Sequence, residues 1–256
     1  YTDWIACKNA KSLYKSHMQP REPLDDNYYD LTDVKSIERQ AKMAKEYSID
    51  GFAIYHYYSN GSILLEKPID ILLNNDQIDI KYFLYWANES WKKTWYGDDN
   101  SLIWEQNYGA EDEWEEHYKY CSNFFKDKRY KKINNMPVFI IYKPSDFKNI
   151  KNFISFWNNL AIADGFDGIY FVKTLGRGEN KELDFFSSTI TREPNYTFAF
   201  SINFFERAWR FVRTRLLNVL NKYVLKRYGL GLVMYKISYD RIWKKIIDNN
   251  LSENNF

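Results

Sequence analysis

The segment 86–91 (WANESW) places one carboxylate, Glu89, among tryptophans. Trp86 and Trp91 flank it, and Trp95 follows shortly after. Apolar neighbours disfavour a charged carboxylate, which suits a general acid or base, and aromatic faces stack on sugar rings. Glu89 is therefore our first catalytic candidate for chemistry at a glycosidic bond. The alternative is a solvated carboxylate in a surface loop.

A second carboxyl group is needed for most glycosidic-bond chemistry, because one group acts as acid and the other as base or nucleophile. Glu193, in the segment TREP at 191–194, is the second catalytic candidate. An ion pair with the adjacent Arg192 is an equal alternative for this carboxylate. Glu105, beside Trp104, is a fallback.

Several other side chains suit contacts with sugar rings, hydroxyls or substrate anions. The substrate-binding candidates are Tyr55, His56, Trp86, Asn88, Trp91, Trp95, Tyr142, Gln19 and Arg21. Arg21 offers a planar fork to a carboxylate or phosphate, with a loop-anchoring ion pair as the alternative. For His56 the default interpretation is a buried, hydrogen-bonded structural histidine, and a sugar contact is the sharper hypothesis. His17 and His117 are given no role.

Motifs for cofactors and metals do not occur in the chain. Gly176-Arg177-Gly178 lacks the third glycine of a dinucleotide fingerprint, and there is no P-loop. Three scattered histidines without a His-Glu-x-x-His pattern predict no metal site. The absence of Asp-x-Asp counts against the metal-nucleotide clasp of many sugar-nucleotide transferases. We therefore expect neither a metal nor a cofactor.

The elements that must position these residues alternate between β-rich runs and helical patterns. The sequence predicts strands at 51–58, 81–86, 137–142, 168–173 and 187–192. It predicts helices at 33–48, with Asp33 as N-cap, and at 68–74, 111–125 and 150–164. Strands that alternate with helices of this length imply a parallel sheet in an α/β protein.

The ends of these strands favour a barrel over a doubly wound sheet. They carry Tyr55-His56-Tyr57, the segment 86–89, Tyr142-Lys143, Lys173-Thr174 and Arg192-Glu193. In a (β/α) barrel, functional groups lie at the carboxyl ends of the strands. Five consecutive strands that end in polar or aromatic groups would surround one pocket. The expected fold is therefore an α/β (β/α)8 TIM-type barrel.

Composition limits the classes of partner. Among 256 residues, 19% are aromatic, and 36 Lys and Arg stand against 34 Asp and Glu, for a net charge of +2. This balance predicts no nucleic-acid partner. Cys7 and Cys121 lie in no metal or redox spacing, which predicts reduced thiols in a cytoplasmic protein. No signal-peptide pattern occurs, and the longest apolar run, 228–235, is too short to span a bilayer.

The segment 204–227 is basic and amphipathic. Apolar residues recur at helical spacing beside seven Lys and Arg and a single acidic residue, Glu206. Such a helix can lie on an anionic membrane surface, which would fit a lipid-linked carbohydrate substrate at the inner membrane. The alternative is an outer barrel helix with a solvated basic face.

Several segments, taken together, resemble the WbsX-type glycosyltransferase family. They are 1–4 (YTDW), 17–21 (HMQPR), 28–31 (YYDL), 51–57, 65–68 (LEKP), 86–91, 106–108 (QNY), 127–130 (DKRY) and 137–142. The resemblance covers 1–197 and implies a barrel like that of glycoside hydrolase family 99, of a kind found in bacterial surface-polysaccharide loci. It also implies that the first strand and the last strands of the barrel are missing here. We therefore expect a barrel domain at 1–197 and a basic helical segment at 198–256.

Three hypotheses follow. The first is a glycosyltransferase of bacterial surface-polysaccharide biosynthesis, making lipopolysaccharide O-antigen or capsule. The second is a glycoside hydrolase that uses Glu89 with Glu193. The third is a non-catalytic carbohydrate-binding remnant.

Overall fold

The computed structural model describes residues 3–12, 18–92, 101–175, 183–201, 204–224 and 238–253. The chain forms two compact units. The sheet unit is Asp30–Arg192, and the helical unit combines Tyr1–Tyr29 with Glu193–Phe256. This division differs from the expected boundary at 197/198, because both ends of the chain join the same unit.

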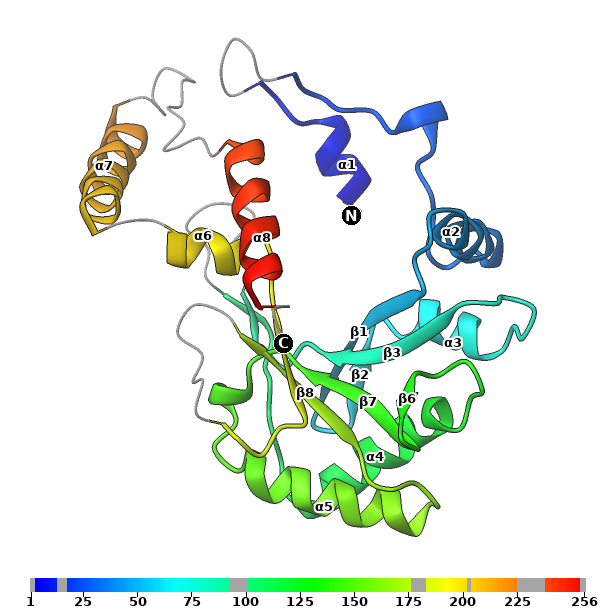
Figure 1. The fold of residues 1–256 in the computed structure, drawn as a ribbon. Coiled ribbons are helices and arrows are strands. Elements are labelled where there is room, and N and C mark those ends of the chain that lie inside the picture. The colour runs from blue at the N-terminus through cyan, green and yellow to red at the C-terminus, as the bar shows by residue number, and fades with distance from the viewer. Residues whose placement is uncertain are drawn as a thin grey trace. The chain divides into compact units, whose positions relative to one another are not determined.

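The sheet unit contains most of the regular structure (Figure 1). Its strands are β1 (Gly51–Ser59), β2 (Ser62–Leu64), β3 (Lys81–Trp86), β4 (Trp91–Lys92), β5 (Leu102–Trp104), β6 (Lys132–Ile133), β7 (Met136–Ile141), β8 (Tyr170–Leu175) and β9 (Ser188–Thr191). Its helices are α2 (Val34–Glu46), α3 (Lys67–Leu73), α4 (Glu111–Phe125) and α5 (Ile150–Ala163), with a 3-10 turn, η2, at Pro144–Asp146.

The main sheet has the strand order β2-β1-β3-β7-β8-β9. β1, β3, β7, β8 and β9 are parallel, whereas β2 and β6 add antiparallel edges to β1 and β7. β4 and β5 form a separate two-stranded ribbon. The five parallel strands follow chain order without the reversal that defines a doubly wound sheet.

All four helices of the sheet unit pack on one face of the sheet. Along β3, Tyr82, Leu84 and Trp86 join one buried cluster with side chains from α2, α3, α4 and α5. Tyr85, whose side chain points to the opposite face, belongs to a second buried cluster, together with Val138 of β7 and Val172 of β8. Figure 1 shows α4 and α5 beneath the sheet. A parallel sheet with helices on a single face is the arrangement of a barrel arc.

A closed barrel is not confirmed. Within the described residues the sheet is open, with β2 at one edge and β9 at the other. Closure requires the last strand to hydrogen-bond to the first, and no such pairing occurs among these strands. The supported fold class is therefore α/β with an open parallel sheet.

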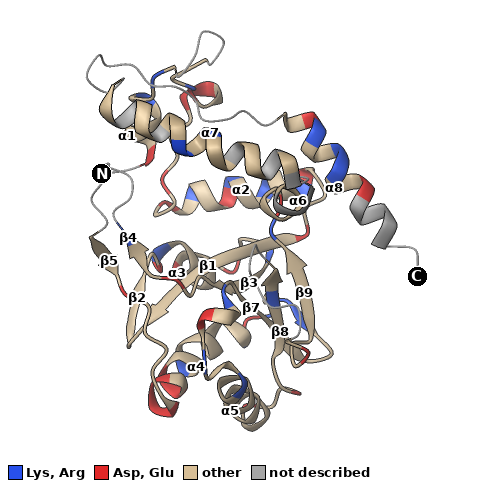
Figure 2. Cartoon of the chain, turned by 90° about the vertical axis from the view of Figure 1, so that its left-hand side faces the viewer, with Lys and Arg blue, Asp and Glu red and all other residues tan. Residues whose placement is uncertain are grey.

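The predicted elements are confirmed in position. Asp33 caps α2, because its carboxylate accepts a hydrogen bond from the Lys35 backbone N–H. In α4 the predicted inward stripe, Trp114, Tyr118, Cys121 and Phe125, is buried. The acidic first turn of α4 (Figure 2) suits the positive end of the helix dipole. Each predicted strand is present within about three residues of its expected bounds.

A buried ion pair joins α3 to the sheet. The Arg129 side chain is 5% exposed and lies 2.6 Å from the Asp127 carboxylate. Its guanidinium also donates to the carbonyl oxygens of Leu72, Asn75 and Ile78. Burial opposes ionisation of Asp127, but hydrogen bonds from Arg129 and Tyr82 hold its pKa below the ordinary value. Arg129 thereby ties together the last turn of α3 and the segment that follows it.

The helical unit contains α1 (Asp3–Lys8), η1 (Leu24–Asp26), α6 (Asn195–Ser201), α7 (Phe204–Tyr223) and α8 (Tyr239–Glu253). Within it, the Trp4 indole N–H donates to the Tyr29 carbonyl oxygen, and the Trp4 ring packs edge-on against Tyr28 and Tyr29. α6 packs against α8. In the described part of the chain, no helix combines the length and the apolar character that crossing a membrane requires.

Candidate functional site

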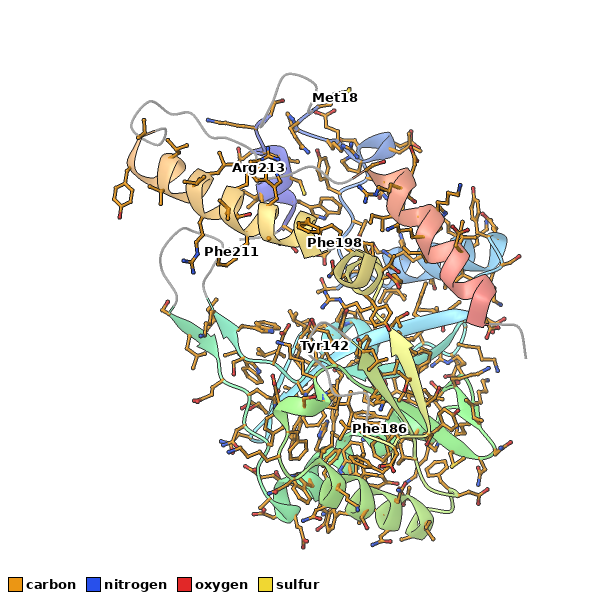
Figure 3. All side chains as sticks on the ribbon, turned by 60° about the vertical axis from the view of Figure 1, so that its left-hand side comes forward. Met18, Tyr142, Phe186, Phe198, Phe211 and Arg213 are labelled. Carbon is orange, nitrogen blue, oxygen red and sulfur yellow. The ribbon has the colours of Figure 1, made fainter. Side chains whose placement is uncertain are left out.

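Five aromatic rings form a continuous series at the carboxyl ends of β1, β3 and β7. This aromatic row runs Trp91, Tyr57, Tyr55, Tyr85, Tyr142. Neighbouring ring centroids lie 4.7, 6.3, 5.0 and 6.1 Å apart in that order. Figure 3 shows Tyr142 where the strands end. Aromatic faces of this kind stack on the apolar faces of sugars.

The alternation of side chains along β1 decides which residues join the row. Tyr55 and Tyr57 point to the face opposite the helices, and Tyr55 stacks on Tyr85 of β3. His56 points to the helical face, where it stacks on Tyr120 of α4. Tyr55 is 46% exposed, whereas His56 is 3% exposed. Tyr55 is therefore the member of the row that is most open to a ligand, whereas Tyr85 is 8% exposed and His56 lies in the core.

Glu89 follows β3 and forms an ion pair beside the row. Its carboxylate lies 2.7 Å from the Lys143 ammonium, and both side chains are 36% exposed. Burial raises the pKa of Tyr57 and Tyr142, and in both cases the negative charge of Glu89 raises it further. Because the carboxylate acts on both tyrosines, it lies beside the row rather than in bulk solvent. The ion pair places the Glu89 carboxylate and the Lys143 ammonium together at this end of the sheet.

Asn88 holds Lys143 in place from inside the protein. Its side chain is fully buried; its Nδ2 donates to the Lys143 carbonyl oxygen at 2.8 Å, and its Oδ1 accepts from the Lys143 N–H at 2.7 Å. Nδ2 also donates to the Tyr108 hydroxyl, which in turn donates to the Asn88 carbonyl oxygen. Asn88 therefore joins the carboxyl ends of β3 and β7 as a strand pair would.

Substitution of Asn88 tests this bridge. We expect Asn88→Ala to lower the free energy of unfolding by about 2–3 kcal/mol, because the Lys143 backbone loses both partners in a half-buried position. Asn123→Ala is the matched control: Asn123 is exposed on α4, so its loss changes stability by less than about 0.5 kcal/mol. Urea unfolding measures both. Equal midpoint shifts would contradict the bridge.

Arg192 and Thr174 complete the far end of the row. The Arg192 guanidinium carbon lies 4.9 Å from the Tyr142 ring centroid, and the Arg192 Nη1 donates to the Tyr142 hydroxyl. The Tyr85 hydroxyl is hydrogen-bonded to the Thr174 hydroxyl at 2.7 Å. β8 and β9 thus contribute to the same edge as β1, β3 and β7.

The structure brings His56, His117 and Cys121 together in the core. Their potential ligand atoms all lie within 4.8 Å of one another. The two Nε2 atoms are 2.8 Å apart, the length of a direct hydrogen bond in which one neutral imidazole donates to the other. Among the described residues no fourth His, Cys, Asp or Glu joins the group. The direct 2.8 Å contact between the two Nε2 atoms matches a hydrogen-bonded histidine pair.

This histidine pair predicts a pH dependence of stability. Burial lowers the pKa of His56 from the ordinary 6.5 to about 3, and burial together with the neighbouring His56 also lowers that of His117. Below pH 6.5 the unfolded chain therefore binds protons on these imidazoles, whereas the folded chain does not. Above pH 6.5 both states hold neutral imidazoles, so the pair lowers the stability of the fold only below that pH. At pH 5 we expect the free energy of unfolding to be lower by about 2 kcal/mol from His56 alone.

Urea unfolding at pH 7, 6 and 5 and constant ionic strength measures this loss. His117→Gln should flatten the pH dependence, because it removes one of the two buried imidazoles. A wild-type stability that stays level from pH 7 to pH 5 would show that the imidazoles become protonated in the folded state.

The remaining predicted site residues have diverse locations. Trp86 is 2% exposed and packs in the helical-face core, with its indole N–H donating to the Tyr58 carbonyl oxygen. Trp95 lies outside the described residues. Gln19 and Arg21 belong to the helical unit, where the Gln19 Oε1 accepts from the Arg21 backbone N–H at 3.1 Å.

Glu193, the second catalytic candidate, also belongs to the helical unit. Its two carboxylate oxygens accept hydrogen bonds from the backbone N–H and the hydroxyl of Thr197, at 3.0 and 2.8 Å. A carboxylate that accepts from the first turn of a helix serves as a local cap. These contacts are those of a cap at the start of α6, and a catalytic role for Glu193 stays a prediction.

Tyr85 carries no signal that the sequence analysis used, and Lys143 and Arg192 were expected at strand ends but without a role in the site. The alternation of side chains along a strand could have indicated Tyr85. Tyr85 precedes Trp86 as Tyr55 precedes His56, so each tyrosine points to the face opposite the helices. Lys143 and Arg192 follow predicted strand ends, but their partners are distant in the chain. His117 was given no role, and the structure places it beside His56.

Aromatic rings beside a carboxylate, at the carboxyl ends of parallel strands, form a site of the type found in carbohydrate-active enzymes. Comparison with known proteins agrees with this class. The family model described as "Glycosyltransferase WbsX" matches residues 1–256, and the chain belongs to this family.

Two curated relatives are each named "Uncharacterized protein WxcX" and come from two strains of Xanthomonas campestris pv. campestris. Each is 25% identical over 197 residues, which is 76% of this chain and 28% of the relative. The chain thus spans just over a quarter of the length of these relatives. A solved structure described as a "Glycoside hydrolase-like protein" superposes with a TM-score of 0.41 at 13% identity, covering 80% of this chain and 63% of that one.

Proposed function

We propose that the protein is a glycosyltransferase that acts in the assembly of a bacterial surface polysaccharide, with Glu89 as its catalytic base. The observation that carries this proposal is the Glu89–Lys143 ion pair beside the aromatic row. Membership in the WbsX family supports the reaction class. The row supports a carbohydrate as acceptor, because its exposed ring, Tyr55, offers an aromatic surface to a sugar.

The ion pair suits the chemistry of transfer. As an acceptor hydroxyl attacks the anomeric carbon of an activated sugar, the bond from that carbon to the leaving group breaks, and the leaving group departs with the electron pair. The Glu89 carboxylate takes the hydroxyl proton. Lys143 is then released from its pairing partner, and its positive charge becomes available to the negative charge on the leaving group.

Product analysis tests the proposal. The complete protein, incubated with nucleotide- or lipid-activated sugars and an oligosaccharide acceptor, is expected to give an extended acceptor detected by mass spectrometry. Release of free sugar from the oligosaccharide, without extension, would replace the transferase with a glycoside hydrolase. Absence of both products with every donor and acceptor would favour a non-catalytic carbohydrate-binding protein.

In the hydrolase alternative, Glu193 must be a catalytic residue together with Glu89. If Glu89 and Glu193 act as a pair, Glu193→Gln should lower hydrolysis as strongly as Glu89→Gln. If Glu193 only caps α6, Glu193→Gln should lower stability by about 1 kcal/mol and leave turnover near the wild-type rate.

We further propose that α7 contacts an anionic membrane surface, which would place the enzyme on the cytoplasmic side of the inner membrane beside a lipid-linked substrate. Phe205, Trp209 and Leu216 follow one another at helical spacing and are 82%, 66% and 60% exposed. Arg213, which Figure 3 labels, lies on the same helix, as does Arg215. Exposed rings with basic neighbours favour the interface of an anionic bilayer.

Vesicle sedimentation tests this contact. The complete protein should bind vesicles that contain phosphatidylglycerol more tightly than vesicles of phosphatidylcholine alone. Trp209→Ser should weaken binding to the anionic vesicles, and Trp243→Ser, on the exposed surface of α8, is the matched control. Equal binding of wild type and Trp209→Ser would remove α7 from the contact.

A further inference from the structure

Three charged side chains surround the Tyr142 end of the aromatic row, and their charges do not cancel. The Tyr142 hydroxyl interacts electrostatically with Glu89, Arg192 and Lys143. Glu89 and Asp146 both act on Lys143, so the cation that has no carboxylate beside it, within the described part of the sheet unit, is Arg192. The Lys143 ammonium also lies 5.6 Å from the centroid of the Tyr142 ring. The unbalanced positive charge at this end of the row is therefore that of Arg192.

The excess charge belongs to Arg192. Lys143 already has a carboxylate partner in Glu89, at 2.7 Å. Among the described residues of the sheet unit, no carboxylate lies within 4.0 Å of the Arg192 guanidinium. Arg192 is exposed, and its Nη1 donates to the neutral Tyr142 hydroxyl. A guanidinium without a carboxylate partner retains donors for an incoming oxyanion.

The position of Arg192 is fixed by its neighbours. The guanidinium stacks over the Tyr142 ring at 4.9 Å, and its hydrogen bond to the hydroxyl of the same residue restrains it further. An arginine held by stacking and by one hydrogen bond loses less side-chain entropy when it binds a ligand. Its planar fork matches the two oxygens of a carboxylate or a phosphate.

We propose that the site recognises a sugar that carries an anionic group, either a carboxylate or a phosphate, and that Arg192 is the residue that binds this oxyanion. The sugar ring stacks on the aromatic row, and its negative group lies at the Tyr142 end. This inference rests on the proposed function, since it names the substrate class of the same site. It adds an acidic sugar to a function that would otherwise admit any carbohydrate.

Binding to matched ligands tests the proposal in the complete protein. Isothermal titration calorimetry with trigalacturonate and with its carboxyl-reduced, neutral form examines the carboxylate. Glucose 1-phosphate and glucose form the phosphate arm. We expect one acidic ligand of the two to bind at least ten-fold more tightly than its neutral form, and the arm that shows the difference identifies the oxyanion. The preference should shrink from 50 to 500 mM NaCl.

Variants separate Arg192 from a general charge effect. Arg192→Gln should weaken the acidic ligand at least ten-fold and change the neutral ligand less than two-fold. Arg192→Lys, which keeps the charge and loses the fork, should lie between these values. Arg39→Gln, an exposed arginine on α2, is the control and should leave both affinities unchanged.

Two outcomes would overturn the proposal. The first is equal affinity for acidic and neutral ligands in both arms, or the absence of binding to all four probes. The second is an acidic preference that Arg192→Gln leaves intact. The transferase assay is read independently: acidic-sugar binding through Arg192 without any transfer would reject the proposed function and retain this inference. Transfer of a neutral sugar, at the same rate in the wild type and in Arg192→Gln, would reject this inference and retain the proposed function.

Discussion

Glu89→Gln in the complete protein is expected to lower the rate of sugar transfer about 1000-fold, within the range that general-base catalysis supplies. The amide keeps the size of the carboxylate but cannot take the acceptor proton. It also leaves Lys143 without its ionic partner. The loss should fall on kcat more than on KM, because the aromatic row that we propose as the sugar-binding surface is unchanged.

A matched carboxylate gives the control for this result. Glu115→Gln removes a charge from α4, where Glu115 pairs with Lys119 one turn away and is 44% exposed. Its activity should equal that of the wild type. If Glu89→Gln retains more than a tenth of wild-type kcat, Glu89 is not the base, and the fallback Glu105 becomes the next variant to measure.

Arg129→Ala is expected to lower the free energy of unfolding by about 3–5 kcal/mol, the largest effect on stability that we anticipate. The substitution leaves the Asp127 carboxylate, which is 6% exposed, without its cation. It also removes the donors to the Leu72, Asn75 and Ile78 carbonyl oxygens. Because many domains are stable by only about 5–15 kcal/mol, this variant should unfold at a much lower urea concentration.

The exposed pair Lys45–Asp79 provides the comparison. Its side chains are 49% and 82% exposed, so Lys45→Ala should cost less than about 1 kcal/mol. A double substitution of Arg129 and Asp127 by apolar residues of similar volume should recover part of the loss, because no charge is left buried. An Arg129→Ala midpoint within error of Lys45→Ala would mean that the pair is not a determinant of stability.

Secondary structure could be predicted well from local patterns. α2 begins after Asp33 because a carboxylate at that position accepts a backbone N–H, and this signal lies within three residues. The inward stripe of α4 follows from the helical repeat of 3.6 residues. β7 could be predicted from a short apolar run after Pro137. These are local features, so they require no knowledge of distant partners.

The expectation of a closed barrel depended on strands pairing across the whole sheet, which local patterns do not specify. The five strand ends do meet at one edge, and that part of the prediction depends only on parallel strands running in the same direction. Whether an arc closes depends on strand number and stagger. In the described residues the arc remains open between β2 and β9.

The candidate site divides in the same way. The sequence by itself determined that Glu89 follows a strand, that Tyr55 lies within a second strand and Tyr142 follows a third, and that aromatic residues are abundant near them. Tertiary structure decided that Lys143 neutralises Glu89, that Arg192 stacks on Tyr142, and that His56 pairs with His117, 61 positions away. It also decided that Trp86 and His56 serve the core. The physical reason is that strand alternation assigns each side chain to a face, whereas only the packing of helices decides which face is buried.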